Sequence, residues 1–150
     1  MKIKIPKNVS FQTLEKYTME QVFLFIIVKL KKQGIKSVKR YEGDDIHICC
    51  YRGDNGAKCA VGHLIPEKIY RSDMERKSFQ LLLENFSNII KRPSDQMYQL
   101  LNDMQSEHDN AEKHVNTFDD ALHSFQHTLE RNFTLQQQQN IKDTYNALVL

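Results

Sequence analysis

Residues 48–66, which read ICCYRGDNGAKCAVGHLIP, bring three cysteines and a histidine together in one short stretch. Thiolates and imidazoles are the ligands that zinc prefers, and a cysteine activated by a histidine can act as a nucleophile. The same stretch contains Asn55-Gly56, the strongest signal for a two-residue hairpin turn, because both turn positions need a positive φ. We therefore expect the cysteines on two antiparallel strands, whose register decides whether they can share a ligand.

In the expected register, Cys50 and Cys59 are diagonal neighbours on one face of the hairpin. His63 lies roughly 13 Å beyond Cys59 along an extended strand, too far for one zinc shell. A bend at Gly62 would bring it back, so a zinc site of Cys50, Cys59 and His63 is the alternative interpretation. The paired Cys-x2-Cys knuckles of structural zinc sites are missing. We predict no metal and no cofactor, with the cysteines as small core residues.

A second candidate site contains the dipeptide His108-Asp109, which is typical of a class of metal-dependent phosphohydrolases. The enzymatic alternative therefore uses His63, His108 and Asp109, with Asp143 as the later aspartate. The dipeptide alone is common, and His108 also continues an apolar helical stripe that begins at Met97, which favours a histidine at the edge of the core. Since neither this set nor a nucleophilic Cys59 is complete, we predict no catalytic residue.

A row of polar residues with 3-4-3 spacing follows later in the chain, formed by Asp120, His123, His127 and Glu130. These residues share one face of an expected helix whose opposite face is apolar. Such a row is typical of a solvated surface, so we do not assign it to a metal.

The segment from residue 29 to residue 40, KLKKQGIKSVKR, contains no acidic residue and is the candidate partner-binding surface, formed by Lys29, Lys31, Lys32, Lys36, Lys39 and Arg40. The net charge of the chain is only +2, but residues 1–92 carry 18 basic against 10 acidic residues and residues 93–150 carry 3 against 9. A basic surface can bind nucleic acid or an acidic protein, and the acidic helices of the second half are the other candidate surface. The two halves can also neutralise each other by packing.

The signals for helices are the clearest in the sequence. Thr18-Met-Glu-Gln21 is a capping box and Gly34 a stop signal, which together predict a helix over 19–33. Its apolar residues cover most of its circumference, so we expect it to be buried, with an exposed dimer seam as the alternative. Further helix starts are expected at Ser72, Ser94, Thr117 and Thr134.

We predict a single domain, 1–150, of the α+β class and mostly helical. Its first part, 1–70, packs a small antiparallel sheet on the buried N-terminal helix; the sheet consists of the hairpin at 46–62 and a third strand near 37–42. Its second part, 71–150, is a helical bundle with short links. The longest apolar run covers only residues 22–28 and no secretory signal is present, so we expect no membrane partner and a cytosolic location.

The stretch CYRGDNGAKCAVGHLIPEKIY, followed by MERKSF, resembles small proteins that tailed bacteriophages and prophages encode. In those proteins a helix ending in Gln-Gly, here Gln33-Gly34, leads into the same motif. The chain departs from their pattern at Glu67, where an Asp usually follows the proline, and at Arg76, where a Gly usually follows Met-Glu. The resemblance implies the cytoplasm of an infected bacterium as the setting, and it carries over no catalytic residue.

We therefore predict a non-enzymatic phage accessory protein that binds and modulates a host factor, in host takeover or counter-defence. A host protein is the expected partner, with nucleic acid and a second copy of the chain as alternatives. The alternative function is a metal-dependent phosphohydrolase or nucleic-acid enzyme, and the second alternative is a zinc-stabilised nucleic-acid-binding domain.

Overall fold

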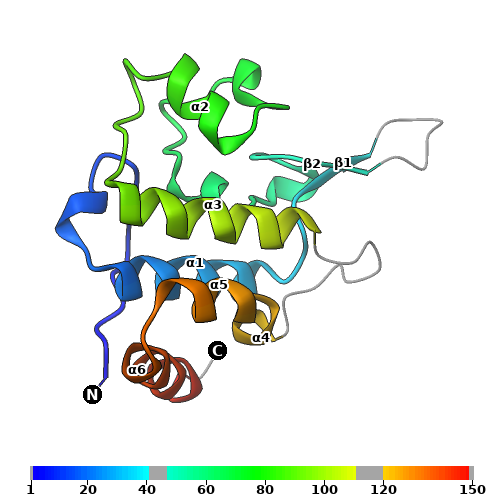
Figure 1. Cartoon of the computed structure of the whole chain (residues 1–150). Helices are drawn as coiled ribbons and strands as arrows, with labels where there is room; N and C mark the ends of the chain where they lie inside the picture. The colour runs from blue at the N-terminus through cyan, green and yellow to red at the C-terminus, as the bar shows by residue number, and fades with distance from the viewer. Residues whose placement is uncertain (1, 41–46, 111–119, 149–150) are drawn as a thin grey trace.

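The chain is mostly helical, as the sequence predicts. The computed structural model describes residues 2–40, 47–110 and 120–148, which contain six α-helices and one pair of short strands (Figure 1). Helix α1 (Met19–Gln33) runs through the middle of the molecule. Packed against it are α3 (Asp95–Asn110), α4 (Ala121–Ser124) and α6 (Leu135–Asn146), and α5 (Gln126–Asn132) packs against α3 and α6.

Helix α1 has the bounds that its sequence signals predict. The Thr18 hydroxyl accepts a hydrogen bond from the Gln21 N–H at 3.2 Å, and the Gln21 side chain accepts one from the Thr18 N–H at 3.0 Å. Gly34 ends the helix with a φ of +78°. The whole apolar run from residue 22 to residue 28 is buried, so the predicted burial is confirmed. These side chains form the core of one chain, and the alternative of an exposed seam on this helix is wrong.

The strands differ from the predicted sheet. Strand β1 (Val38–Arg40) pairs antiparallel with β2 (His47–Cys49), and Val38 lies opposite Cys49. Strand β1 corresponds to the strand expected near 37–42. In the described chain after Asn55-Gly56 there is no strand, so the hairpin at 46–62, its register and the three-stranded meander are wrong.

The Asn-Gly turn has the expected φ values, but no pair of β-strands extends from it in the described residues. Asn55 has a φ of +60° and Gly56 a φ of +74°, as a hairpin turn requires. The Gly53 N–H then donates to the Ala57 carbonyl at 2.8 Å and closes the loop. A few residues later the chain enters the 3-10 turn η3 (Val61–Leu64), so the second arm of the hairpin does not form.

The residues before and within β1 occupy the space between the two arms of the expected hairpin. The buried Ser37 hydroxyl lies 2.7 Å from the Cys50 carbonyl oxygen and 3.1 Å from the Ala57 carbonyl oxygen. Gly53 packs so closely here that a β-carbon on it would lie 2.7 Å from the Val38 nitrogen. The Ser37 hydroxyl thus lies between the two arms and binds a backbone carbonyl of each.

Two helix starts in the second half of the chain are confirmed. The Ser94 hydroxyl accepts a hydrogen bond from the Met97 N–H at 3.3 Å, at the start of α3. Thr134 and Gln137 form the capping box of α6. Both signals are local, which explains why the sequence alone identifies them.

The start expected at Ser72 is wrong. Residues Ser72–Met74 form a 3-10 turn, and α2 (Phe79–Asn85) begins later, with the Ser78 side chain as its cap. The start expected at Thr117 lies outside the described residues, and the described part of that region begins with α4, which Asp120 caps.

The N-terminal segment is tied to distant parts of the chain. The Phe11 N–H donates to the Leu64 carbonyl at 3.0 Å, and the Ile3 N–H donates to the Thr144 hydroxyl of α6 at 2.9 Å. One hydrophobic core contains buried residues from both predicted parts of the chain. In the described ranges, no helix combines the length and the apolar character needed to cross a bilayer.

Candidate functional site

Arg52, in the motif that carries the phage resemblance, holds the loop around it together. Its terminal nitrogens donate to the Gly62 carbonyl at 2.7 Å and to the Ile65 carbonyl at 2.6 Å. Its Nε lies 3.3 Å from a carboxylate oxygen of Glu67, and its guanidinium lies over the Tyr70 ring. Five N–H donors in a fixed plane allow one arginine to bind several irregular backbone segments. The role of Arg52 is therefore structural.

Glu75 closes the same loop from the other side. Its carboxylate accepts hydrogen bonds from the backbone N–H groups of Tyr51 at 2.8 Å and Arg52 at 3.0 Å, and from the Tyr70 hydroxyl at 2.5 Å. Burial, together with this last hydrogen bond, raises the pKa of Tyr70, which stays protonated and donates. These tertiary contacts explain why Glu75 does not complete the predicted capping box.

Gln33 joins the end of α1 to the segment that follows the Asn-Gly turn. Its side-chain oxygen accepts from the Lys58 N–H at 2.9 Å, and its side-chain nitrogen donates to the Lys58 carbonyl at 2.9 Å. The Gln33 side-chain amide thus makes the two hydrogen bonds to Lys58 that a neighbouring β-strand would otherwise make. We call Gln33, Arg52 and Glu75 the backbone clamp, because each binds peptide groups of the loop between β2 and the 3-10 turn Ser72–Met74.

Two of the three cysteines are small buried core residues, as expected, and the side chain of Cys49 lies outside the described part of the structure. Cys50 and Cys59 are both buried thiols, and the Cys59 sulfur accepts a hydrogen bond from the Gly62 N–H at 3.3 Å. Burial raises the pKa of Cys59, so it is not a thiolate at neutral pH. No three His, Cys, Asp or Glu side chains of the described residues could together hold a metal ion, so the zinc alternative of Cys50, Cys59 and His63 is wrong.

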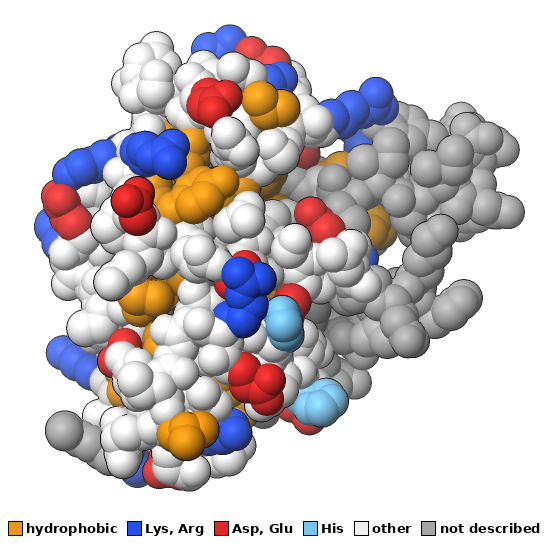
Figure 2. Space-filling view, in the orientation of Figure 1, with side chains coloured by type: hydrophobic (Ala, Val, Ile, Leu, Met, Phe, Trp, Pro, Cys, Tyr) orange, Lys and Arg blue, Asp and Glu red, His pale blue; other side chains and the backbone are white. Residues whose placement is uncertain are grey.

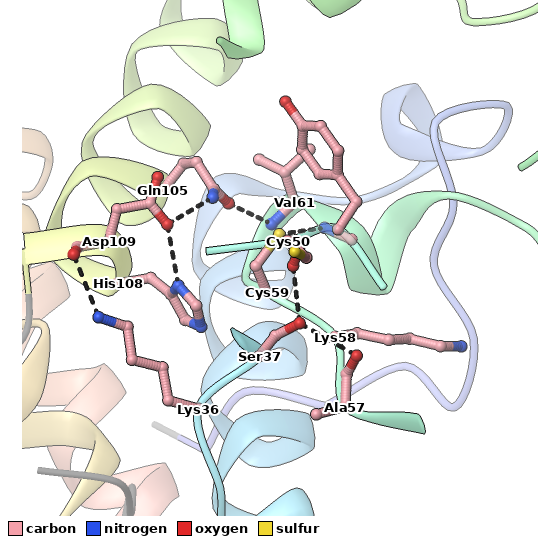
Figure 3. A network of polar contacts seen from close by, with 12 residues as sticks. Lys36, Ser37, Cys50, Ala57, Lys58, Cys59, Val61, Gln105, His108 and Asp109 are labelled. Atoms are coloured by element: carbon pink, nitrogen blue, oxygen red, sulfur yellow. Dashed lines mark hydrogen bonds and ion pairs between the residues drawn. The ribbon is translucent and has the colours of Figure 1, made fainter. Parts of the chain in front are cut away.

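His108 and Asp109 belong to a hydrogen-bond network that ends on a backbone amide (Figure 3). The His108 ring is fully buried, and its Nδ1 lies 3.1 Å from an Asp109 carboxylate oxygen. The same oxygen accepts from the Gln105 side chain at 3.0 Å, and Gln105 in turn accepts from the Val61 N–H at 3.0 Å. Burial lowers the pKa of His108, although Asp109 opposes this shift. The network positions the start of η3 and does not present its histidine to solvent.

His63 lies apart from the hollow that Asp109 lines. It is half-buried and lines a hollow of about 330 Å³ together with Lys29 and Lys58, whereas Asp109 lines another hollow beside Cys50. Burial and the nearby cations Lys58 and Lys29 lower the pKa of His63 to about 3. Since His63, His108 and Asp109 form no ligand group, the metal-dependent enzymatic set is wrong. We call Lys29, Lys58 and His63 the basic hollow.

Two lysines of the candidate basic surface, Lys29 and Lys36, contact other parts of the protein. Lys36 is only 9% exposed, and its Nζ donates to the Asp109 carbonyl oxygen at 3.1 Å. Lys29 lines the basic hollow, and its Nζ lies 5.5 Å from the centroid of the Phe25 ring. These two residues therefore do not belong to one continuous surface.

The other basic residues of this segment lie at the end of α1 and in β1. Lys32 and Lys39 are exposed, and Lys31 is half-buried. The side chain of Arg40 lies outside the described part of the structure. On the face shown in Figure 2, lysines and arginines are interspersed with acidic side chains and are not gathered into one patch.

The polar row of the second half faces solvent, as predicted. His123, His127 and Glu130 are exposed, but they belong to two short helices, α4 and α5, instead of one. Asp120 accepts a hydrogen bond from the His123 N–H at 3.1 Å. Its carboxylate is thus a helix cap.

Sequence reasoning missed the part that Lys58 and Glu75 play. Lys58 reaches the basic hollow only because the chain bends after it, and no local pattern indicates that bend. For Glu75 the sequence did contain a signal. The similar phage proteins usually have a glycine where this chain has Arg76, and a glycine directly after Glu75 argues against the helix that the capping box predicts. Arg76 indeed has a φ of +62°.

Comparison of the chain with protein-family models, curated proteins and solved structures found no match. The resemblance to phage proteins therefore stays a prediction. What the structure defines is a mostly helical protein whose most distinctive motif is a backbone clamp, with a basic hollow beside it.

Proposed function

We propose that the chain is a non-enzymatic accessory protein, of the kind that tailed bacteriophages encode, which binds and modulates a host protein in the host cytoplasm. The observation that carries this proposal is that Cys59 and His108, two candidate reactive residues, are buried in the protein. Cys59 is a fully buried thiol, and the fully buried His108 belongs to a network that holds a backbone amide. An enzyme presents such groups to a substrate.

The partner surface that we propose is the end of α1 together with β1. Lys32 and Lys39 are exposed there, with the half-buried Lys31 beside Lys32 in the sequence. Exposed cations of this kind accelerate association with an acidic partner and select against a basic one. We do not include Lys29 and Lys36 in this surface, because Lys29 lines the basic hollow and Lys36 donates to the Asp109 carbonyl.

Affinity capture from a bacterial lysate tests this proposal if surface variants are compared. The full-length protein is used as bait, after the lysate has been treated with nuclease so that nucleic acid cannot bridge bait and prey. The test variant is Lys32→Glu with Lys39→Glu. The matched control is Lys2→Glu with Lys7→Glu, which makes the same charge change at two other exposed lysines.

We expect a prey protein that the wild type and the control capture alike and that the test variant loses at least about tenfold, since two charge contacts are reversed. The purified prey must then bind directly, with an affinity that falls as salt rises. Equal capture by both variants, or a prey that disappears after nuclease treatment, would contradict the proposal.

The enzymatic alternative is tested separately. Wild type and Asp109→Asn are assayed for phosphodiesterase activity with manganese. We expect no turnover from either protein. Turnover that is lost in the variant would contradict a non-enzymatic role.

A further inference from the structure

The basic hollow has the size and lining of a small-molecule site. Its volume of about 330 Å³ lies at the lower end of the range of about 300–1,000 Å³ that is usual for such sites. Polar and apolar groups both line it, among them Lys29, Lys58, His63, Val9, Phe25 and Ile65. A ligand there would have both cationic and apolar side chains within reach.

Cations outnumber anions at the hollow. Lys58 Nζ lies 2.9 Å and Arg52 Nε lies 3.3 Å from the same oxygen of Glu67, and Lys29 adds a third cation. One carboxylate cannot neutralise three cations, so an excess of positive charge remains. The Glu67 side chain is 71% exposed, and an ion pair this exposed is weak enough for another anion to replace it.

His63 adds a hydrogen-bonding group without adding charge at neutral pH. Its Nε2 is buried and has no hydrogen-bond partner among the described residues. Leaving a buried polar atom without a partner costs free energy, which a ligand oxygen or hydroxyl at this position would recover. The residues that line the hollow thus include two lysines and one histidine, which suit a ligand with several oxygens.

We propose that the basic hollow binds the phosphate group of a small phosphorylated molecule. A phosphate monoester has a charge of about −1.5 to −2 at pH 7 and three acceptor oxygens, which match the excess charge and the donors of Lys29, Lys58 and His63. The apolar lining residues Val9, Phe25 and Ile65 are available to the carbon part of the ligand. A carboxylate has a smaller charge and fewer oxygens, so it fits less well. This inference does not depend on the proposed partner protein.

The test is a titration of the full-length protein, followed by calorimetry and by the NMR signals of the His63 ring, assigned with His63→Gln. The probes are phenyl phosphate, inorganic phosphate, benzoate, a ten-residue oligothymidylate, and sodium chloride at matched ionic strength. We expect saturable binding of phenyl phosphate with shifts at His63, weaker binding of inorganic phosphate, and still weaker binding of benzoate. Equal binding of benzoate and phenyl phosphate, tighter binding of the oligonucleotide, or shifts no larger than those with chloride would overturn the proposal.

Variants separate the hollow from general surface charge. Lys29→Gln and Lys58→Gln should each weaken phenyl phosphate binding about tenfold or more, because each removes one charge-assisted contact. Lys32→Gln removes an exposed charge from the same helix and should leave the affinity unchanged. Glu67→Gln should tighten binding severalfold, because it removes the competing carboxylate. A misfolded variant cannot bind more tightly, so failure of Glu67→Gln to tighten binding counts against the proposal.

Discussion

The guanidinium of Arg52 lies over the ring of Tyr70, with 4.7 Å between its Cζ and the ring centroid. The Tyr70 hydroxyl donates to Glu75, and Glu75 also binds the N–H group of Arg52 itself. Arg52, Tyr70 and Glu75 thus each contact the other two and together hold one loop. The Arg52 side chain is only 13% exposed, and hydrogen bonds shielded from water in this way are stronger than those at a surface.

Replacing Arg52 with lysine should lower the free energy of unfolding by about 1.5–3 kcal/mol. An ammonium group cannot reach the Gly62 and Ile65 carbonyls together, and a buried carbonyl that loses its donor is costly. Urea denaturation measures the change. Arg71→Lys is the matched control, because the Arg71 side chain is 61% exposed and its ion pair with Asp73 lies at the surface. The control should change stability by less than about 0.5 kcal/mol, and equal effects of both substitutions would contradict the clamp.

Replacing Arg76 with glycine should raise the free energy of unfolding. Arg76 has a φ of +62°, a conformation that costs a residue with a β-carbon about 1 kcal/mol or more. After the larger unfolded-state entropy of glycine is subtracted, we expect a gain of about 0.5–1 kcal/mol in thermal or urea unfolding. Arg76→Ala removes the same side chain but keeps the β-carbon, so it should not stabilise. Equal stabilisation by both variants would assign the effect to the side chain and not to φ.

Stability should fall as the pH is lowered from about 6.5 toward 3. The pKa of His63 is lowered from 6.5 to about 3 in the folded protein, so between these values the unfolded chain binds the proton and the folded one does not. The loss approaches about 1.4 kcal/mol per pH unit and per histidine, and His108, whose pKa is also lowered, adds to it. Urea midpoints across this range should show a smaller slope for His63→Gln than for the wild type. A slope unchanged in His63→Gln would contradict the assignment.

Cys59 should resist alkylation until the protein unfolds. It is fully buried and its pKa is raised by burial, so both access and thiolate formation are suppressed. Iodoacetamide labelling at pH 8, read site by site by mass spectrometry, should reach Cys59 at the rate at which the structure opens. Addition of urea supplies the control for complete labelling. Rapid modification of Cys59 in the native protein would revive the nucleophile interpretation.

Local signals were sufficient for the long helices. The capping boxes at Thr18 and Thr134 and the serine at Ser94 act within one helical turn, and α1, α3 and α6 begin where they predict. The burial of α1 also follows from its own composition, since a helix that is apolar on most sides must be covered by others.

Signals that depend on distant segments failed. The Asn55-Gly56 turn has the expected positive φ values. The flanking residues, however, hydrogen-bond to the Ser37 hydroxyl and, through Gly53 and Ala57, to each other at the turn itself, so no strand pairing extends from it. In the same way, Glu75 has the right spacing from Ser72 for a capping box, but it binds two N–H groups more than twenty residues away. Tertiary partners outweighed local preference in both places.

The candidate site was predictable only in its parts. The motif, the buried cysteines and the lysine-rich segment can be read from the sequence, but the basic hollow combines Lys29 of α1 with Lys58 and His63 from two sides of a bend. The bend takes the place of the second hairpin arm, so a sequence argument built on the hairpin separates these residues.

Most hydrogen bonds of the backbone clamp end on peptide groups, and among the described residues only Glu67 and Tyr70 meet it with their side chains. Every amino acid offers the same carbonyl, so evolutionary drift at positions such as Ile65 or Lys58 leaves the grip of Arg52 and Gln33 intact. Side chains at such positions can therefore be exchanged while these hydrogen bonds stay, which would let one scaffold present different loop surfaces.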